Sequence, residues 1–472
     1  MFCEPVGARA IARVLPATAL GVLGAVLLAG CSTGTAIQHE TMARQDIQVT
    51  ASHYRPHGAK PPLPVLTDNS TLTDLMQYAL LNNPKVESSY YEWAGAVEDI
   101  TTARSLPDPM LTLGAEISNG LPSLSAALMS DPGMNWPGAG KLPLRGEAAY
   151  GGAEKKRAVF ENDLLDTALA VKRAYYQMWV LEEQIRWTRE VLGLVGTAEN
   201  VARQRMAVGK VTQQDVLRAQ MEQERLKNQL VNLEDSRATV CARLRSALGL
   251  RPDEPLPSFV LRLDPTAANF TEQSLLDTAF TRNPRLKQMR GEVLQAMALY
   301  QLARKSTVPD YSWGLGVRIG IPPAITPSFG MTLPIWRDKI RAEIASGESG
   351  VNAANAKLSA EELDLAVRFA ETAYSWREAD RNVTLYDNEL LPRAKAALDS
   401  ARGGYVSGPT GFPDLLDAER TLLEYHMSRA EAAGQREMVL AEMSLVILGR
   451  WPENVQPLLQ ESPSGTTNSL SQ

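Results

Sequence analysis

The chain has 472 residues, a length that suits two or three ordinary domains. Its 44% hydrophobic and 22% charged residues are typical of a folded protein and exclude an intrinsically disordered one. The net charge of −6 argues against a nucleic-acid-binding surface, and an aromatic content of only 6% favours helix-rich packing.

The N-terminal segment has the pattern of an export signal. A basic start is followed by an apolar stretch, Val14–Leu28, which is too short to span a membrane. The sequence Leu-Ala-Gly-Cys that ends at Cys31 resembles the bacterial lipoprotein cleavage box, in which the cysteine becomes the lipidated first residue. We therefore expect a signal peptide over residues 1–30 and a lipidated, Pro-rich leader over 31–71. A plain signal with an incidental cysteine is the alternative.

The rest of the chain contains an internal repeat. Four residues recur 200 positions later, at Leu75 and Leu275, Ala79 and Ala279, Asn83 and Asn283, and Pro84 and Pro284. Farther on the shift is 199, as for Ala174-Tyr175 and Ala373-Tyr374, Gly209 and Gly408, and Asp215 and Asp414. Chance matches would not keep one register over this length, so the chain is a tandem duplication. The predicted units are a first repeat (72–252), a linker (253–272), a second repeat (273–452) and a polar tail (453–472).

Each repeat begins with a predicted helix, over Thr73–Ser105 and Gln273–Lys305. Strictly alternating side chains follow in Met110–Ser118 and Tyr311–Gly320, which predicts strands with one apolar and one polar face. Outer-membrane barrel strands have this length and pattern. A half-buried strand of a soluble sheet has the same alternation and is the alternative.

A second strand is predicted in each repeat, before Pro137 and before Pro334. The earlier one should lie within Ser123–Trp136, a segment that Pro132 interrupts.

Long helices are predicted after the strands, over Leu144–Val208 and Lys339–Gly403. Each would reach about 95 Å at about 1.5 Å per residue. Turns at Gly209 and Gly408 should then reverse the chain into return helices, over Gln213–Leu248 and Pro413–Leu448. Apolar residues in the first long helix keep the 4-3-4 spacing of a coiled-coil seam, and the second helix repeats it, at Leu164, Ala168, Val171 and Tyr175 and at Leu363, Val367, Ala370 and Tyr374.

This order of elements resembles the TolC-type outer-membrane efflux family over nearly all of the chain after the leader. The matching residues are the two Asn-Pro pairs in the opening helices, Leu333-Pro334 leading into Ile340-Arg341, and the segments Gly209–Ala219 and Gly408–Ala418. The resemblance implies a mainly α fold with a small β part, a duplicated helix–strand–strand–long helix–return helix. It also implies a trimer, whose three sets of four strands close a 12-stranded β-barrel joined to a coiled-coil α-helical barrel.

The resemblance also implies partners and sites. Asp414 and Asp417 correspond to an Asp-x-x-Asp pair that lines the closed periplasmic gate, where three subunits gather six carboxylates. The alternative is that the helix dipole favours acidic side chains at the start of a helix, which is how we interpret Asp215. The tips of the helical hairpins should dock a periplasmic adaptor protein that links the duct to an inner-membrane pump, through Gly209, Lys210, Gly408 and Pro409. A solvated loop without a partner is the alternative for these tips.

The sequence contains no convincing motif for catalysis or for cofactor binding. Gly138-Ala139-Gly140-Lys141 lacks the spacing of a phosphate loop, and the four histidines are not clustered at ligand spacing. We therefore predict no enzyme, no metal site and no cofactor beyond the covalent lipid on Cys31.

We expect a passive exit duct in the outer membrane of a Gram-negative bacterium, extending into the periplasm. Leu106–Met110 and Gly140–Glu147 resemble the branch that serves heavy-metal pumps. A multidrug duct, a type I protein-secretion duct and an exported coiled-coil lipoprotein without a pore are the alternatives.

Overall fold

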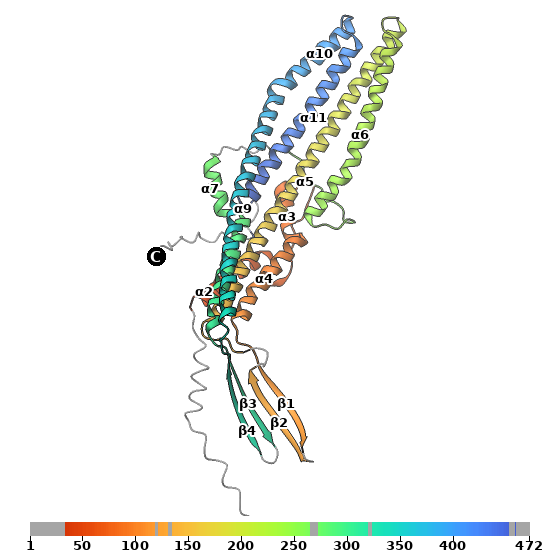
Figure 1. Cartoon of the computed structure of the whole chain (residues 1–472). Helices are drawn as coiled ribbons and strands as arrows, with labels where there is room; N and C mark the ends of the chain where they lie inside the picture. The colour runs from red at the N-terminus through yellow and green to blue at the C-terminus, as the bar shows by residue number, and fades with distance from the viewer. Residues whose placement is uncertain are drawn as a thin grey trace, which may run out of the picture.

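The computed structural model describes residues 34–118, 121–130, 135–264, 272–319 and 323–452, together with Leu458. The molecule is elongated, with long helices at one end and a small sheet at the other (Figure 1). Cys31 lies outside the described residues.

The opening helix of each repeat is broken into two, a correction to the continuous helices expected over Thr73–Ser105 and Gln273–Lys305. The break falls at Asn83 and Asn283, whose ψ angles of 124° and 125° leave the helical region. The following prolines lack an N–H and favour an extended preceding residue, so each proline starts a new helix. The resulting helices are α3 (Leu72–Asn82), α4 (Pro84–Arg104), α7 (Glu272–Arg282) and α8 (Pro284–Arg304). A short 3-10 turn, η2 (Lys305–Thr307), follows α8.

Four strands form one antiparallel sheet in the order β1-β2-β3-β4. The strands are β1 (Pro109–Ser118), β2 (Leu121–Ser130), β3 (Tyr311–Ile319) and β4 (Ala324–Met331). The strand predicted within Ser123–Trp136 begins earlier, at Leu121, and ends at Ser130, before Pro132 can interrupt the ladder.

The alternation predicted from the sequence appears across the whole sheet. Leu113, Ala126, Val317 and Ile325 stand opposite one another across the four strands and form one apolar row. The next row is small or polar, with Thr112, Ala127, Gly316 and Thr326. The sheet therefore has one apolar and one small or polar face. β1 and β4 are its two edges, because each has a single neighbouring strand among the described residues.

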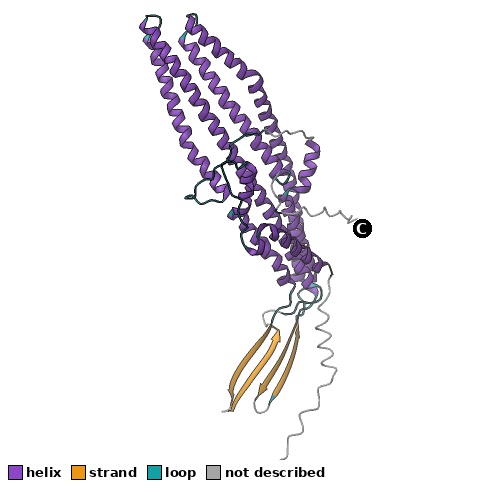
Figure 2. Ribbon diagram, turned by 180° about the vertical axis from the view of Figure 1, so that it is seen from behind, coloured by secondary structure: helices purple, strands orange, loops and turns teal. Residues whose placement is uncertain are grey.

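Two helical hairpins rise from the sheet and lie side by side (Figures 1 and 2). The first consists of α5 (Lys141–Ala207) and α6 (Gln213–Leu248). In the second, the long helix is interrupted by a π turn next to Pro392, a residue that cannot donate a helical hydrogen bond. This hairpin consists of α9 (Arg337–Leu385), η3 (Tyr386–Leu390), α10 (Leu391–Ser407), α11 (Phe412–Glu442) and the π turn η4 (Met443–Ile447).

Within a single chain, the predicted coiled-coil seam is buried on the first long helix, as expected, but it is exposed on the second, where the prediction is wrong. Leu164, Ala168, Val171 and Tyr175 of α5 are all buried. Their counterparts on α9 are exposed, with Leu363 71%, Val367 56% and Tyr374 54% accessible. The difference follows from position, because α5 packs between α6 and α11, whereas α9 lies at the edge of the helical layer.

The leader contains a helix, α2 (Gly34–Tyr54), where we predicted no secondary structure from the sequence. The 3-10 turn η1 (Pro56–Gly58) follows it. α2 packs on α4 and α5 through ion pairs. Arg44 donates to Glu98 at 2.7 Å, and Arg157 donates to Asp46 at 2.5 Å. The main apolar core lies here, where α3, α4 and α5 meet around Trp93.

No helix within the described residues is both long enough and apolar enough to cross a membrane.

Candidate functional site

The first hairpin turns at a glycine that the sequence singled out. Gly209 has φ +69°, a left-handed conformation that only glycine adopts without strain. Its N–H donates to Met206 O at 2.9 Å, and Lys210 N–H donates to Arg205 O at 2.9 Å, which closes the end of α5. Lys210 is exposed at the tip.

The second hairpin turns in the same way. Gly408 has φ +115°, and its N–H donates to Gly404 O at 2.8 Å. Pro409 is exposed, and α11 begins three residues later at Phe412. The turns predicted at Gly209 and Gly408 are therefore present, and both glycines have a positive φ.

The two tips are packed against each other, so they form one surface at the end of the molecule. The Arg205 guanidinium of the first tip lies 4.8 Å from the Tyr405 ring of the second and donates to Tyr405 O. Buried apolar residues from both hairpins form a shared core beneath the tips, including Val195, Val216 and Phe412.

The two aspartates proposed for the gate lie on the first turns of α11, and both are exposed. Asp414 Oδ2 accepts the N–H of Gly411 at 3.1 Å, so this carboxylate caps the helix. Asp417 accepts no hydrogen bond that the structure records. In the first repeat, Asp215 is less accessible, with 18% of its side chain exposed, and its carboxylate lies 4.0 Å from Arg218. Capping of the helix start therefore accounts for Asp414. It does not account for Asp417.

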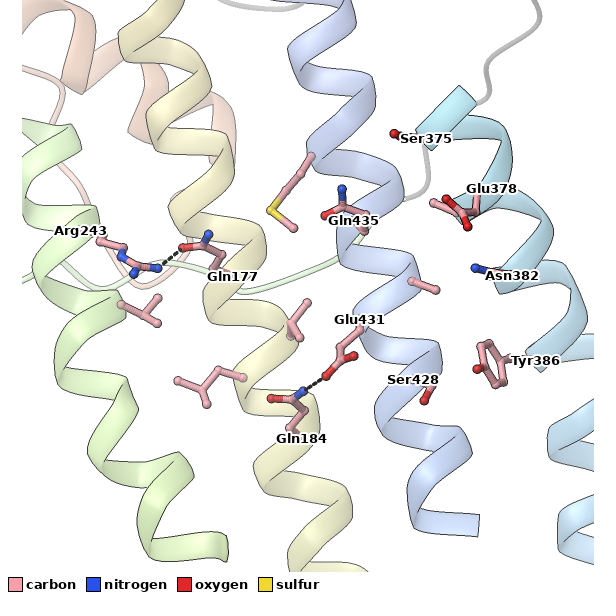
Figure 3. A pocket seen from close by; sticks show the side chains of 16 residues that line it. Gln177, Gln184, Arg243, Ser375, Glu378, Asn382, Tyr386, Ser428, Glu431 and Gln435 are labelled. Atoms are coloured by element: carbon pink, nitrogen blue, oxygen red, sulfur yellow. Dashed lines mark hydrogen bonds between the residues drawn. The ribbon is translucent and has the colours of Figure 1, made fainter. Parts of the chain in front are cut away.

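A groove of about 770 Å³ runs along the middle of the helical layer, between α5, α6, α9 and α11 (Figure 3). Its walls carry uncharged polar side chains, among them Gln177, Asn382 and Gln435. Arg243 donates to Gln177 at 3.1 Å, and Gln184 donates to Glu431 at 2.8 Å. This polar wall, which also includes the charged side chains of Arg243, Glu378 and Glu431, suits contact with water and solutes.

Two buried acids near the tips were missed by the sequence analysis. Glu222 is only 2% exposed and accepts hydrogen bonds from Arg225 and Arg420, each at 2.5 Å. Glu419 is 3% exposed, and its Oε2 has no hydrogen-bond partner. Burial raises the pKa of the Glu419 carboxyl to about 7. The signal in the sequence was an acid on the apolar stripe of α11, between Leu416 and Leu423.

The structure offers no cluster of metal ligands within the described ranges. No group of three or more histidine, cysteine or acidic side chains is placed to hold a metal ion there. His39, one of the four histidines, pairs its Nδ1 with Glu147 at 2.8 Å and stacks on Tyr150.

The sequence matches the family model for outer membrane efflux proteins over residues 75–250 and 275–446, one match for each repeat. Together the two matches cover well over half of the chain. The chain belongs to the outer membrane efflux protein family.

Known proteins extend this likeness. The chain is 22% identical over 394 residues to the cobalt-zinc-cadmium resistance protein CzcC of Cupriavidus metallidurans. The aligned region covers 80% of this chain and 90% of CzcC. Among solved structures, the outer membrane protein VceC of Vibrio cholerae has a TM-score of 0.68 at 17% identity, covering 80% of this chain and 96% of VceC. CusC has a TM-score of 0.68 at 14% identity, covering 82% of this chain and 94% of CusC. These likenesses establish the channel-forming fold that the sequence predicted.

Proposed function

We propose that the chain is one third of the outer-membrane exit duct of a tripartite efflux system, and that heavy-metal cations are its cargo. The observation that carries the proposal is the open sheet with an exposed apolar face. Leu113 is 71% accessible and Phe329 is 72% accessible. A patch of such large apolar side chains is unfavourable in free energy when it is exposed to water. β1, β2 and β3, of nine or ten residues, match the length needed to cross a bilayer at a tilt, and β4 has eight residues.

Closure requires more than one copy, and the resemblance to the TolC-type family implies three. Edge strands are not tolerated in lipid, and four strands are too few to close, because single-chain barrels begin at about eight. Pairing β4 of one copy with β1 of the next removes both edges. The same arrangement places the exposed stripe of α9 (Leu363, Val367 and Tyr374) at the boundary between neighbouring copies.

The helical hairpins provide the periplasmic part of the duct in this proposal. At about 1.5 Å per residue, the 67 residues of α5 reach about 100 Å. The polar groove would line the passage, and Asp414 and Asp417 would narrow its entrance. A helix of this length cannot reach the inner membrane, so the tips at Gly209 and Gly408 would dock an adaptor protein and, through it, a pump. The duct would be anchored in the outer membrane by lipid on Cys31.

Metal cargo is supported by the likeness to CzcC, which extends over most of both chains. Acidic side chains at the tips favour cations over anions at the entrance.

Two experiments test the proposal. Extraction should require detergent, and the protein should migrate as a heat-sensitive trimer; a monomer released by salt would reject the duct. Deletion should then sensitise cells to cobalt, zinc, cadmium, copper or silver salts. Sensitisation to organic drugs alone would assign the duct to the multidrug branch.

A further inference from the structure

The junction between helices and sheet contains an ion pair that joins the two repeats. Lys141, the first residue of α5, is 8% exposed, and its Nζ lies 2.7 Å from Asp310 Oδ1. Asp310 immediately precedes β3, and the same oxygen accepts the Gly138 N–H at 2.8 Å. The first long helix of one repeat is thus tied to the first strand of the other.

The duplication supplies a second copy of both partners. Asp108 precedes β1 as Asp310 precedes β3, each after a proline. Arg337 is the first residue of α9, as Lys141 is of α5. Residues 135–147 align without a gap with 331–343, and in that register Arg145 and Glu147 match Arg341 and Glu343.

The second set of partners is unpaired in the chain as the structure describes it. Asp108 and Arg337 are both exposed, and neither makes a recorded ion pair or hydrogen bond. They stand beside opposite edges of the sheet, Asp108 before β1 and Arg337 after β4. Three strand spacings of roughly 4.8 Å separate the two edges by about 14 Å, which is beyond ion-pair distance.

The contact between β2 and β3 shows how the second pair would meet. These antiparallel strands are the last of one repeat and the first of the next, and their pairing brings the end of β2 to the start of β3. Trp136 also bridges Tyr311 at this end of the sheet. Pairing β4 with β1 of another copy repeats this arrangement and brings Arg337 to Asp108 of that copy.

We infer that Arg337 of each copy forms an ion pair with Asp108 of the next copy, at the same level of the molecule as Lys141 and Asp310. The inference rests on the trimer of the proposed function and names the residues that join its subunits. The position that corresponds to Gly138 is Pro334, which has no N–H to donate. A guanidinium compensates, because it can give a carboxylate two parallel hydrogen bonds where an ammonium gives one. The two junctions therefore offer Asp310 and Asp108 the same number of donors.

Charge reversal tests the pair in the full-length protein purified in detergent. D108R and R337D should each raise the dissociation constant of the trimer by about tenfold, and the D108R/R337D double variant should recover most of that loss. R341D is the matched control. Arg145, its counterpart in the first repeat, lines a cavity with Leu299 and Asp310 but makes no recorded hydrogen bond or ion pair with the other repeat, so R341D should leave the trimer unchanged.

Cross-linking provides a second measurement that does not depend on stability. With Cys241→Ser as background, D108C together with R337C should give covalent trimers with a short bifunctional thiol reagent, and either cysteine alone should give none. The matched pair K141C with D310C should cross-link only within a chain and leave the subunits separable. Trimeric protein that shows neither rescue nor cross-linking overturns the ion pair and leaves the duct standing. An unsubstituted protein that is monomeric in detergent rejects the proposed trimer itself.

Discussion

The Asn-Pro break in the second repeat is held by an almost completely buried asparagine, and Asn283→Ala should destabilise the protein strongly. Asn283 is 1% exposed. Its Oδ1 accepts the N–H groups of Arg285 at 2.9 Å and Leu286 at 3.3 Å, which caps α8. Its Nδ2 donates to Val446 O at 2.9 Å and Ile447 O at 3.0 Å, in the π turn that ends the return helix.

The expected loss follows from these four bonds. Removing an N-cap costs about 1 kcal/mol. Each of the two donated bonds contributes about 1 kcal/mol net, so the total is about 3 kcal/mol. Asn83 makes the same kind of contact, from Nδ2 to Ala247 O at 3.0 Å, but it is half-buried and caps through Lys85 alone. Asn83→Ala should therefore cost about 2 kcal/mol.

The assay is the free energy of unfolding in denaturant, followed by circular dichroism of the detergent-solubilised protein. Asn352→Ala, on an exposed face of α9, is the control and should lose nothing. Asn283→Asp keeps the cap acceptor but removes both donors, so it should lose more than the control. If Asn283→Ala unfolds at the same denaturant concentration as Asn352→Ala, the four bonds do not stabilise the break and the reasoning is wrong.

Other predictions address the tips. Burial raises the pKa of Glu419 to about 7 from 4.5, so the folded state loses stability as pH rises through that window. Glu419→Gln should flatten the pH profile of unfolding and add about 3 kcal/mol at pH above 7, and an unchanged profile would contradict the burial argument. Replacing Gly209 and Gly408 together with valine forces positive φ on branched residues and should abolish cross-linking to the adaptor while the trimer persists; survival of both cross-linking and export would refute the tip assignment. Substituting Asp414 and Asp417 with asparagine should raise conductance in planar bilayers and weaken block by divalent cations, and unchanged block would reduce both residues to helix-start acids.

The sequence predicted the order of elements well because that order rests on strong local signals. Alternation marked β1 and β3, and the lengths of α5 and α6 followed from long runs without a proline beyond the first turn. Glycine and proline located the turns, including Gly209 and Gly408, because their backbone restrictions act within one or two residues.

The differences arise where the structure depends on distant neighbours. Pro84 and Pro284 end the preceding helices locally, but Asn83 and Asn283 also bond to carbonyls 163 or 164 residues away, contacts that no local pattern reveals. The buried acid Glu419 was missed because its signal, an acid on the apolar stripe between Leu416 and Leu423, is weaker than the helix-start position of Asp414. Which acid has a perturbed pKa depends on the packing of α5 and α10 around α11.

The two repeats have similar sequences but different neighbours in the folded chain. This asymmetry explains why the apolar seam is buried on α5 and exposed on α9. α5 has a helical neighbour on both sides, so Leu164 and Tyr175 are fully packed. α9 has the same pattern but packs on helices of its own repeat, chiefly α8 and α11, so Leu363 and Tyr374 stay exposed. A duplicated chain that kept apolar residues on an exposed edge for no purpose would carry a solubility cost. The proposed ring of copies would remove the cost, because each α9 would then meet the first repeat of the next chain, as α5 meets α11 within one chain. The proposed trimer thus gives one common explanation for the exposed seam, the unpaired edges of β1 and β4, and the unpaired charges of Asp108 and Arg337: the repeat would continue across the subunit boundary.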